Sequence, residues 1–146
     1  MNIKKLYVKM LTMNQSKSYK KMIKKYKKEL TELNRDACTR PWDWSFGLDY
    51  LIAYMRFMQE YFTLRSKDEE SDEWAIRAKD TLTETLNAYG DWQNCHLSEE
   101  YFSHTEDGAI EFIGDKSVLK EHNKELNKRR KKFFTLLSKY VESWWS

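Results

Sequence analysis

Apolar residues recur every three or four positions along most of the chain, which is the period of helices that bury one face. In the segment that begins at Ser16, this apolar stripe comprises Tyr19, Met22, Ile23, Tyr26, Leu30 and Leu33. Lysines fill most positions between them, so the segment predicts an amphipathic helix with a basic outer face. A shorter apolar set in residues 3–10 predicts a preceding helix, and the polar residues 14–18 separate the two.

The stretch RPWDWSFGLDYLIAYMRFMQEYF, residues 40–62, has a different pattern. Pro41 disfavours helical geometry at the residue before it, and Asp43 or Ser45 can cap the start of a new helix. We therefore expect a helix that begins just after Pro41 and ends near Ser66.

That helix is apolar around most of its circumference and leaves a narrow polar line of Asp49, Arg56 and Glu60. A helix of this kind is typical of the buried centre of a fold, so we expect it to be the hydrophobic axis of the protein. The alternative is that some of its rings line a ligand pocket, in which these three residues supply the polar contacts.

The rest of the chain predicts two more helices and one hairpin. A helix is predicted over residues 74–89, with Gly90 as its C-terminal cap. A Glu-Asp-Gly turn signal within residues 101–113 favours a small β-hairpin. The last helix is predicted over residues 117–144. Its inner stripe comprises Leu119, His122, Leu126, Phe133, Leu137, Tyr140 and Trp144.

These elements predict a mainly α protein, a compact bundle of four to five helices with a small hairpin near residues 101–113. Six Trp, nine Tyr and seven Phe indicate a core built from rings, and four Gly with one Pro leave too few turns for an all-β fold. At 146 residues we expect one domain, with the basic residues 1–36 as a peripheral extension.

Cysteine usage and hydropathy indicate a cytoplasmic protein. Cys38 and Cys95 have neither metal-ligand spacing nor a disulfide framework, so they are interpreted as reduced thiols. The N-terminal segment has no apolar run like that of a signal peptide, and no segment has enough uncharged apolar residues to span a membrane.

Charge is distributed in blocks. Residues 1–36 carry a net charge of +8, residues 41–115 carry −12, and residues 116–146 carry +6. One interpretation is that the basic and acidic blocks attract each other across the surface. The other is that the two basic helices form a cationic face for an anion or nucleic acid. The residues proposed for that face are Lys24, Lys25, Lys28, Arg129 and Arg130.

The sequence offers little catalytic chemistry. The segment CHLSEEYFSH, residues 95–104, contains ligand-capable side chains, but their spacing is not that of a zinc site. Acidic residues of the segment 68–84 could hold Mg²⁺, although solvated acids explain them more simply. No nucleophile, P-loop or dinucleotide motif is present. We predict no catalytic residue, no metal and no cofactor.

Three stretches resemble a family of small uncharacterised proteins of tailed bacteriophages and prophages. They are RPWDWSFGLDYLIAYMRFMQEYF, IRAKDTLTETL and the terminal FFTLLSKYVESWWS. Like that family, the chain has a Pro-Trp-Asp-aromatic segment and a Trp-Trp pair near its end, but its ending is Trp-Trp-Ser where the resemblance implies Trp-Trp-Asp. The resemblance covers most of residues 40–146. It implies an accessory protein made in the cytoplasm of an infected bacterium.

Three functions follow from these observations. The first is a non-catalytic binding protein that sequesters a host defence component, either a protein or a nucleotide signal. For a nucleotide, the expected binding residues are Trp42, Trp44, Asp49, Arg56, Trp74 and Arg77. The alternative is a nucleic-acid-binding protein that uses the basic helices, and the third is a metal-dependent phosphohydrolase or nuclease. No membrane partner is expected, and self-association into a homo-oligomer is left open.

Overall fold

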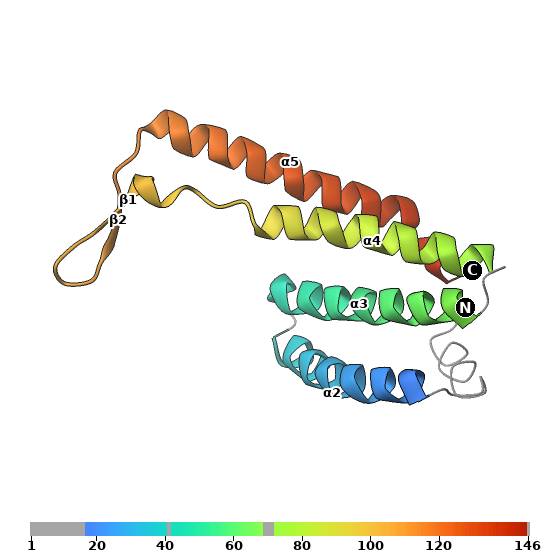
Figure 1. Ribbon diagram of the computed structural model, residues 1–146. Coiled ribbons are helices and arrows are strands. Elements are labelled where there is room, and N and C mark those ends of the chain that lie inside the picture. Colours follow the sequence, from blue (N-terminus) through green and yellow to red (C-terminus); the bar gives the residue numbers. More distant parts are fainter. Residues whose placement is uncertain (1–16, 41, 69–71, 146) are drawn as a thin grey trace. The chain divides into compact units, whose positions relative to one another are not determined.

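The computed structural model describes residues 17–40, 42–68 and 72–145, and this part of the chain is mainly α-helical (Figure 1). Its long helices are α2 (Lys17–Thr39), α3 (Trp44–Asp68), α4 (Glu73–Gln93) and α5 (Lys116–Tyr140). Short 3-10 helices span Glu99–Tyr101 (η1) and Val141–Trp144 (η2), and the strands are β1 (Phe102–His104) and β2 (Ile110–Phe112). The predicted mainly α class with a small hairpin is confirmed. The helix predicted in residues 3–10 lies outside the described residues.

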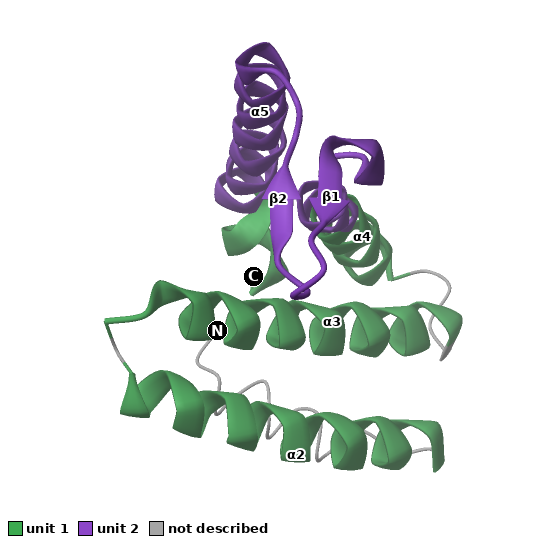
Figure 2. Cartoon of the chain, turned by 90° about the vertical axis from the view of Figure 1, so that its left-hand side faces the viewer, with its two compact units in different colours: residues 1–86, 140–146 green, residues 87–139 purple. Residues whose placement is uncertain are grey.

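The chain divides into two compact units, which Figure 2 shows in different colours. Unit 1 comprises residues 1–86 and 140–146, and unit 2 comprises residues 87–139. The division falls inside α4 and near the end of α5. Compact units are not the same as independently folding domains, so the single domain stays a prediction.

In unit 1, α2 and α3 form an antiparallel helical hairpin. Tyr26 of α2 contacts Phe57 of α3 with ring centroids 5.5 Å apart, and Tyr19 approaches Tyr61 at 6.1 Å. Asp43 caps α3, because its carboxylate accepts hydrogen bonds from the backbone and the hydroxyl of Ser45 at 3.0 and 2.6 Å. The boundary and cap predicted between these helices are confirmed.

The core of unit 1 is centred on α3. The buried residues of this helix are Ile52, Ala53, Met55, Met58, Tyr61 and Phe62. The stripe predicted for α2 faces them, with Tyr19, Met22 and Tyr26 buried. The start of the aromatic segment does not belong to this core, since Trp42 and Trp44 are 79% and 63% exposed. Trp42 precedes α3 and Trp44 is its first residue.

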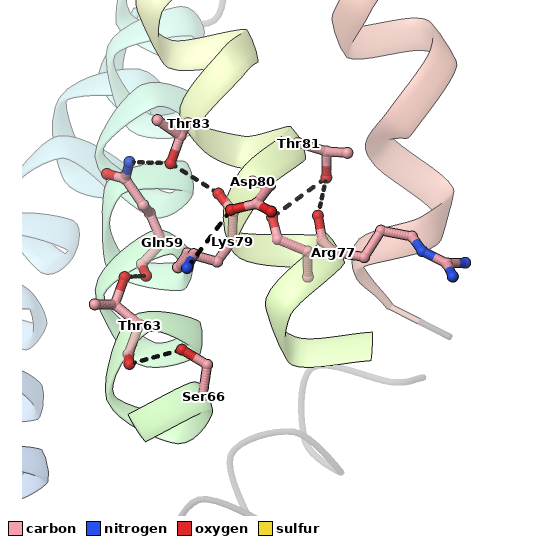
Figure 3. A network of polar contacts seen from close by, with 9 residues as sticks. Gln59, Thr63, Ser66, Arg77, Lys79, Asp80, Thr81 and Thr83 are labelled. Carbon is pink, nitrogen blue, oxygen red and sulfur yellow. Dashed lines mark hydrogen bonds and ion pairs between the residues drawn. The ribbon is translucent and has the colours of Figure 1, made fainter. Parts of the chain in front are cut away.

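Polar contacts connect α3 to α4. Gln59 donates a hydrogen bond to the Thr83 hydroxyl at 2.8 Å, which Figure 3 shows as a bridge between the two helices. Arg65 forms a 2.6 Å ion pair with Asp72, and both side chains are only 12% exposed. Asp72 also caps α4 by accepting a hydrogen bond from the backbone of Ala75 at 3.0 Å.

The prediction that α4 ends at Gly90 was wrong, because the helix continues to Gln93. Gly90 lies inside the last turn, and its carbonyl accepts a hydrogen bond from the backbone N–H of Asn94 at 2.9 Å. The added turn contributes Trp92, whose ring contacts Phe133 and Phe134 within unit 2. Tertiary packing of this kind extends a helix past a residue that would favour a cap.

Unit 2 also contains the hairpin. Strand β1 pairs antiparallel with β2 in the register Phe102–Phe112, Ser103–Glu111 and His104–Ile110. Gly108 has a φ of +83° in the connecting turn, a conformation that glycine adopts without strain. In α5, Phe133 is fully buried and Leu119 is 37% exposed. Leu119 was therefore wrongly placed on the inner stripe, which begins further along the helix.

Candidate anion-binding surfaces

The outer face of α2 is a continuous lysine surface. Its members are Lys17, Lys20, Lys21, Lys24, Lys25, Lys27 and Lys28, and all seven are exposed. No acidic residue occurs between positions 17 and 28. The buried stripe of Tyr19, Met22 and Tyr26 occupies the opposite side of the helix, so folding directs the ammonium groups into solvent. We call these seven residues the lysine face.

One part of the lysine face is hollowed. A surface cavity of about 340 Å³ is lined by Lys24, Lys27, Lys28, Thr31 and Glu32. Lys24 and Lys28 were predicted anion-binding residues, and the structure places them at this cavity. Lys27 was missed, although its position in the lysine run was a sufficient signal.

Lys25 differs from its neighbours because it contacts residues of its own unit. Its ammonium nitrogen lies 3.6 Å from Glu60 and 4.7 Å from the centre of the Tyr26 ring. Electrostatic interaction with Tyr26, and then with Glu60, raises the pKa of Lys25. Its charge is therefore partly neutralised by α3, whereas no ion pair is recorded for the other six lysines among the described residues.

The corner between α2 and α3 forms a second candidate surface. A cavity of about 350 Å³ is lined by Asp36, Thr39, Arg40 and Phe46. The guanidinium of Arg40 lies 5.4 Å from the centre of the Phe46 ring, which is a cation–π contact. Exposed Trp42 and Trp44 lie in the same corner by sequence. Arg40 and Phe46 were not predicted as site residues, although both flank the Trp-Asp-Trp motif.

A third surface lies in unit 2, between the end of α4 and α5. Its cavity of about 340 Å³ is lined by Ala88, Asp91, Glu125, Lys128, Arg129 and Lys132. Arg129 donates to the carboxylate of Glu125 and to the backbone carbonyl of Asp91, both at 2.9 Å. The hydrogen bond from Arg129 lowers the pKa of Glu125, and the same bond raises that of Arg129. The pair is thus charged at neutral pH.

This geometry gives Arg129 a structural task as well as a charge. It satisfies a carbonyl at the C-terminal end of α4, where the helix dipole is negative and the last carbonyls lack helical partners. Lys128 and Lys132 are exposed and extend the positive charge along the groove. Arg130, also predicted for the anion face, is exposed on α5. The predicted anion-binding residues therefore fall in two units, with α2 in one and Arg129 and Arg130 in the other.

The residues predicted to bind a nucleotide do not line the three cavities described above. Asp49 and Arg56 are exposed on α3, and Arg77 is exposed on α4. The backbone carbonyl of Arg77 accepts a hydrogen bond from the Thr81 hydroxyl, and Figure 3 shows the Arg77 guanidinium directed away from it.

Trp74 is held by structural contacts. Its ring meets Phe62 edge-on at 4.9 Å and lies 5.1 Å from the Arg65 guanidinium. Its indole N–H donates to the carbonyl of Ser143 at 3.0 Å. Of the three predicted tryptophans, Trp42 and Trp44 are thus the ones with a free ring surface.

Metal-ligating side chains are not clustered in the part of the chain that the structure describes. There, no group of three or more His, Cys, Asp or Glu residues is arranged to hold a metal ion. Glu69 and Glu70 of the acidic segment lie outside that part. Cys38 and Cys95 are free cysteines.

Comparisons with known proteins give no match: no family model, no curated protein and no solved structure is similar to this chain. Among the described helices, none combines the length and the apolar character needed to cross a membrane.

Proposed function

We propose that the protein is a non-catalytic binding protein that sequesters a polyanionic partner on the lysine face of α2. The observation that carries the proposal is the seven exposed lysines without an intervening acid. Like charges one turn apart repel each other, so a helix face with charges of only one sign costs the free protein some helix stability. A polyanion removes that repulsion by neutralising the whole face.

The phage resemblance makes a host defence component the expected partner, either an acidic protein or a nucleotide signal. Sequestration needs no catalytic group, and it requires an exposed surface of complementary charge. The lysine face meets that requirement, and its hollow, which is lined by Lys24, Lys27 and Lys28 with one acid, Glu32, carries a net positive charge that favours an anionic group.

The test is affinity capture from lysates of infected bacteria with three forms of the protein. The first is the wild type, and the second is K20Q/K24Q/K28Q, which removes three of the seven charges of the lysine face. The third is a matched control, K116Q/K120Q/K124Q, which removes the same charge from exposed positions of α5. Bound proteins and bound small molecules are both identified.

We expect the wild type and the control to retain the same partner, and the K20Q/K24Q/K28Q protein to lose it. Salt should elute the partner, because contacts between exposed charges are screened. Equal retention by all three forms would contradict the proposal.

Nucleic acid is the second candidate partner. It is favoured by the exposed tryptophans that follow the lysine face in unit 1, since single-strand-binding proteins combine basic surfaces with stacking rings.

A further inference from the structure

We infer that the polyanion bound by α2 is a single strand of nucleic acid, whose phosphates lie along the lysine face and whose bases stack on Trp42 and Trp44. This inference rests on the proposed polyanion binding, and it selects the second of the two candidate partners, nucleic acid.

The positive charges of α2 form a line along the helix. Lys17, Lys21, Lys24, Lys28 and Arg35 recur at steps of three, four and seven residues, which places them on one side of α2. The charge of Arg35 is partly neutralised by Asp36, which lies 3.5 Å away. From Lys17 to Arg35 the line covers 18 residue steps, so at about 1.5 Å per residue it is about 27 Å long. An extended strand can make several phosphate contacts over that length.

The line leads toward exposed rings. Arg40 directly follows the end of α2, and Trp42 and Trp44 come next, with 79% and 63% of their surfaces exposed. Two tryptophans this exposed, with only Asp43 between them, are unusual, because an indole is among the largest apolar groups and is mostly covered in a folded protein. An exposed indole offers a flat face on which any base can stack.

The combination of charge and rings favours a single strand over the other polyanions. A duplex keeps its bases stacked inside, so its phosphates can use the lysines but its bases cannot reach the indoles. An acidic polypeptide can pair with the lysines, yet it has no planar groups in regular alternation with its charges. A single strand presents phosphates and free base faces together.

The test measures fluorescence anisotropy of a labelled dT oligomer of about 15 nucleotides, near the upper end of common site sizes. The full chain is used as wild type, as W42A/W44A and as K20Q/K24Q/K28Q. Because both tryptophans are exposed, their removal leaves the core intact, and circular dichroism verifies this. The control I110A/I113A removes two exposed apolar side chains from the hairpin region, where Ile110 and Ile113 are 64% and 59% exposed.

We expect W42A/W44A to weaken binding about tenfold or more, with the salt dependence unchanged, because stacking releases no counterions. K20Q/K24Q/K28Q changes two residues of the line, Lys24 and Lys28, so it should weaken binding and flatten the slope of log K against log salt by about 1.4, roughly 0.7 for each lost phosphate contact. The I110A/I113A protein should bind like the wild type.

Several results would overturn the inference and still leave the proposed function standing. One is binding by W42A/W44A within twofold of the wild type while the lysine variant fails. Another is a duplex with the same number of phosphates that binds as tightly as the dT oligomer. A third is polyglutamate that competes as well as the oligomer, which would identify an acidic protein as the partner class. If neither the oligomer nor polyglutamate binds, the inference and the polyanion proposal both fall.

Discussion

Trp144 donates its indole N–H to the hydroxyl oxygen of Thr81 at 2.9 Å, across 63 positions of sequence. Trp144 is fully buried, and Thr81 in turn donates to the backbone carbonyl of Arg77 at 2.9 Å. The neighbouring Trp145 stacks on Tyr54 with ring centroids 5.6 Å apart. Within unit 1, the Trp-Trp pair thus connects residues 144–145 to α4 through Thr81 and to α3 through Tyr54.

Removal of the buried indole should cost stability. We expect Trp144→Ala to lower the free energy of unfolding by about 3–5 kcal/mol, since it empties a large part of the core. Thr81→Ala should cost about 1–3 kcal/mol, because the indole N–H is left buried without its acceptor. Urea denaturation of both variants measures these losses. Thr81→Ser keeps the hydroxyl and is the control. A Thr81→Ala protein as stable as Thr81→Ser would show that the hydrogen bond does not contribute.

The ion pair between Arg65 and Asp72 should be sensitive to the loss of either partner. Asp72→Ala removes both the charge that faces Arg65 and the cap of α4, so we expect a loss of about 3–5 kcal/mol. Asp72→Asn keeps the capping oxygen and should cost less. The double variant Arg65→Met with Asp72→Asn should recover stability relative to Asp72→Ala, because no buried charge is then left uncompensated. Thermal unfolding of the three proteins tests this order, and a double variant less stable than Asp72→Ala would contradict it.

The local pattern determines much of this fold, as α2 shows. Its stripe of Tyr19, Met22 and Tyr26 is readable from spacing alone, because one face of a helix is buried whichever element packs on it. The hairpin is readable for a similar reason, since Gly108 supplies the positive φ that the turn needs. The extension of α4 past Gly90 was not readable, because it depends on packing of Trp92 against α5.

The candidate site was predictable only in part. Lys24 and Lys28 were identified because a lysine run is visible in sequence, but spacing alone did not separate exposed rings from buried ones. The sequence alone does not distinguish Trp42, Trp44 and Trp74 by their burial. The first two are exposed, whereas Trp74 contacts Phe62 and Arg65, a difference that arises from tertiary contacts between helices.

The hairpin should respond to a methyl group at Gly114. A Cβ there would lie 2.5 Å from Cζ of Phe112 and 3.0 Å from Cδ1 of Tyr101, so the rings must move. We expect Gly114→Ala to destabilise unit 2 by about 1–3 kcal/mol through overpacking.

Gly47→Ala is the matched control, because a Cβ at that helical position meets nothing within 4 Å. It should stabilise α3 by about 0.5–1 kcal/mol. Amide hydrogen exchange separates the two effects, and unchanged exchange in the hairpin of Gly114→Ala would contradict the first.

Arg129 should control the end of α4. Arg129→Ala removes the hydrogen bonds to Glu125 and to the carbonyl of Asp91, so we expect faster hydrogen exchange at the backbone amides of Asn94 and Cys95. Glu125→Gln is the control, because it keeps the bond to the Asp91 carbonyl.

Acid should weaken the ion pair between Arg129 and Glu125. Arg129 lowers the pKa of Glu125 below its ordinary value of 4.5. A lowered pKa in the folded state stabilises the fold above pH 4.5, and this contribution is lost as the pH falls through the folded value. The urea midpoint of the wild type should therefore fall more steeply below pH 4.5 than that of Glu125→Gln, which has no carboxyl group to protonate at this position. The same acid response in both proteins would assign it to another group.

Alkali should act on Tyr54. Burial, and then electrostatic interaction with Tyr50, raises the pKa of Tyr54 to about 12 from its ordinary value of 10.0. The folded state thus holds this proton more tightly than the unfolded state does. Its contribution to stability is complete below pH 10 and is lost as the pH rises to about 12. Tyr54→Phe has no proton to lose, so its urea midpoint should decline less steeply over this range, and parallel declines in both proteins would show that Tyr54 ionises without resistance from the fold.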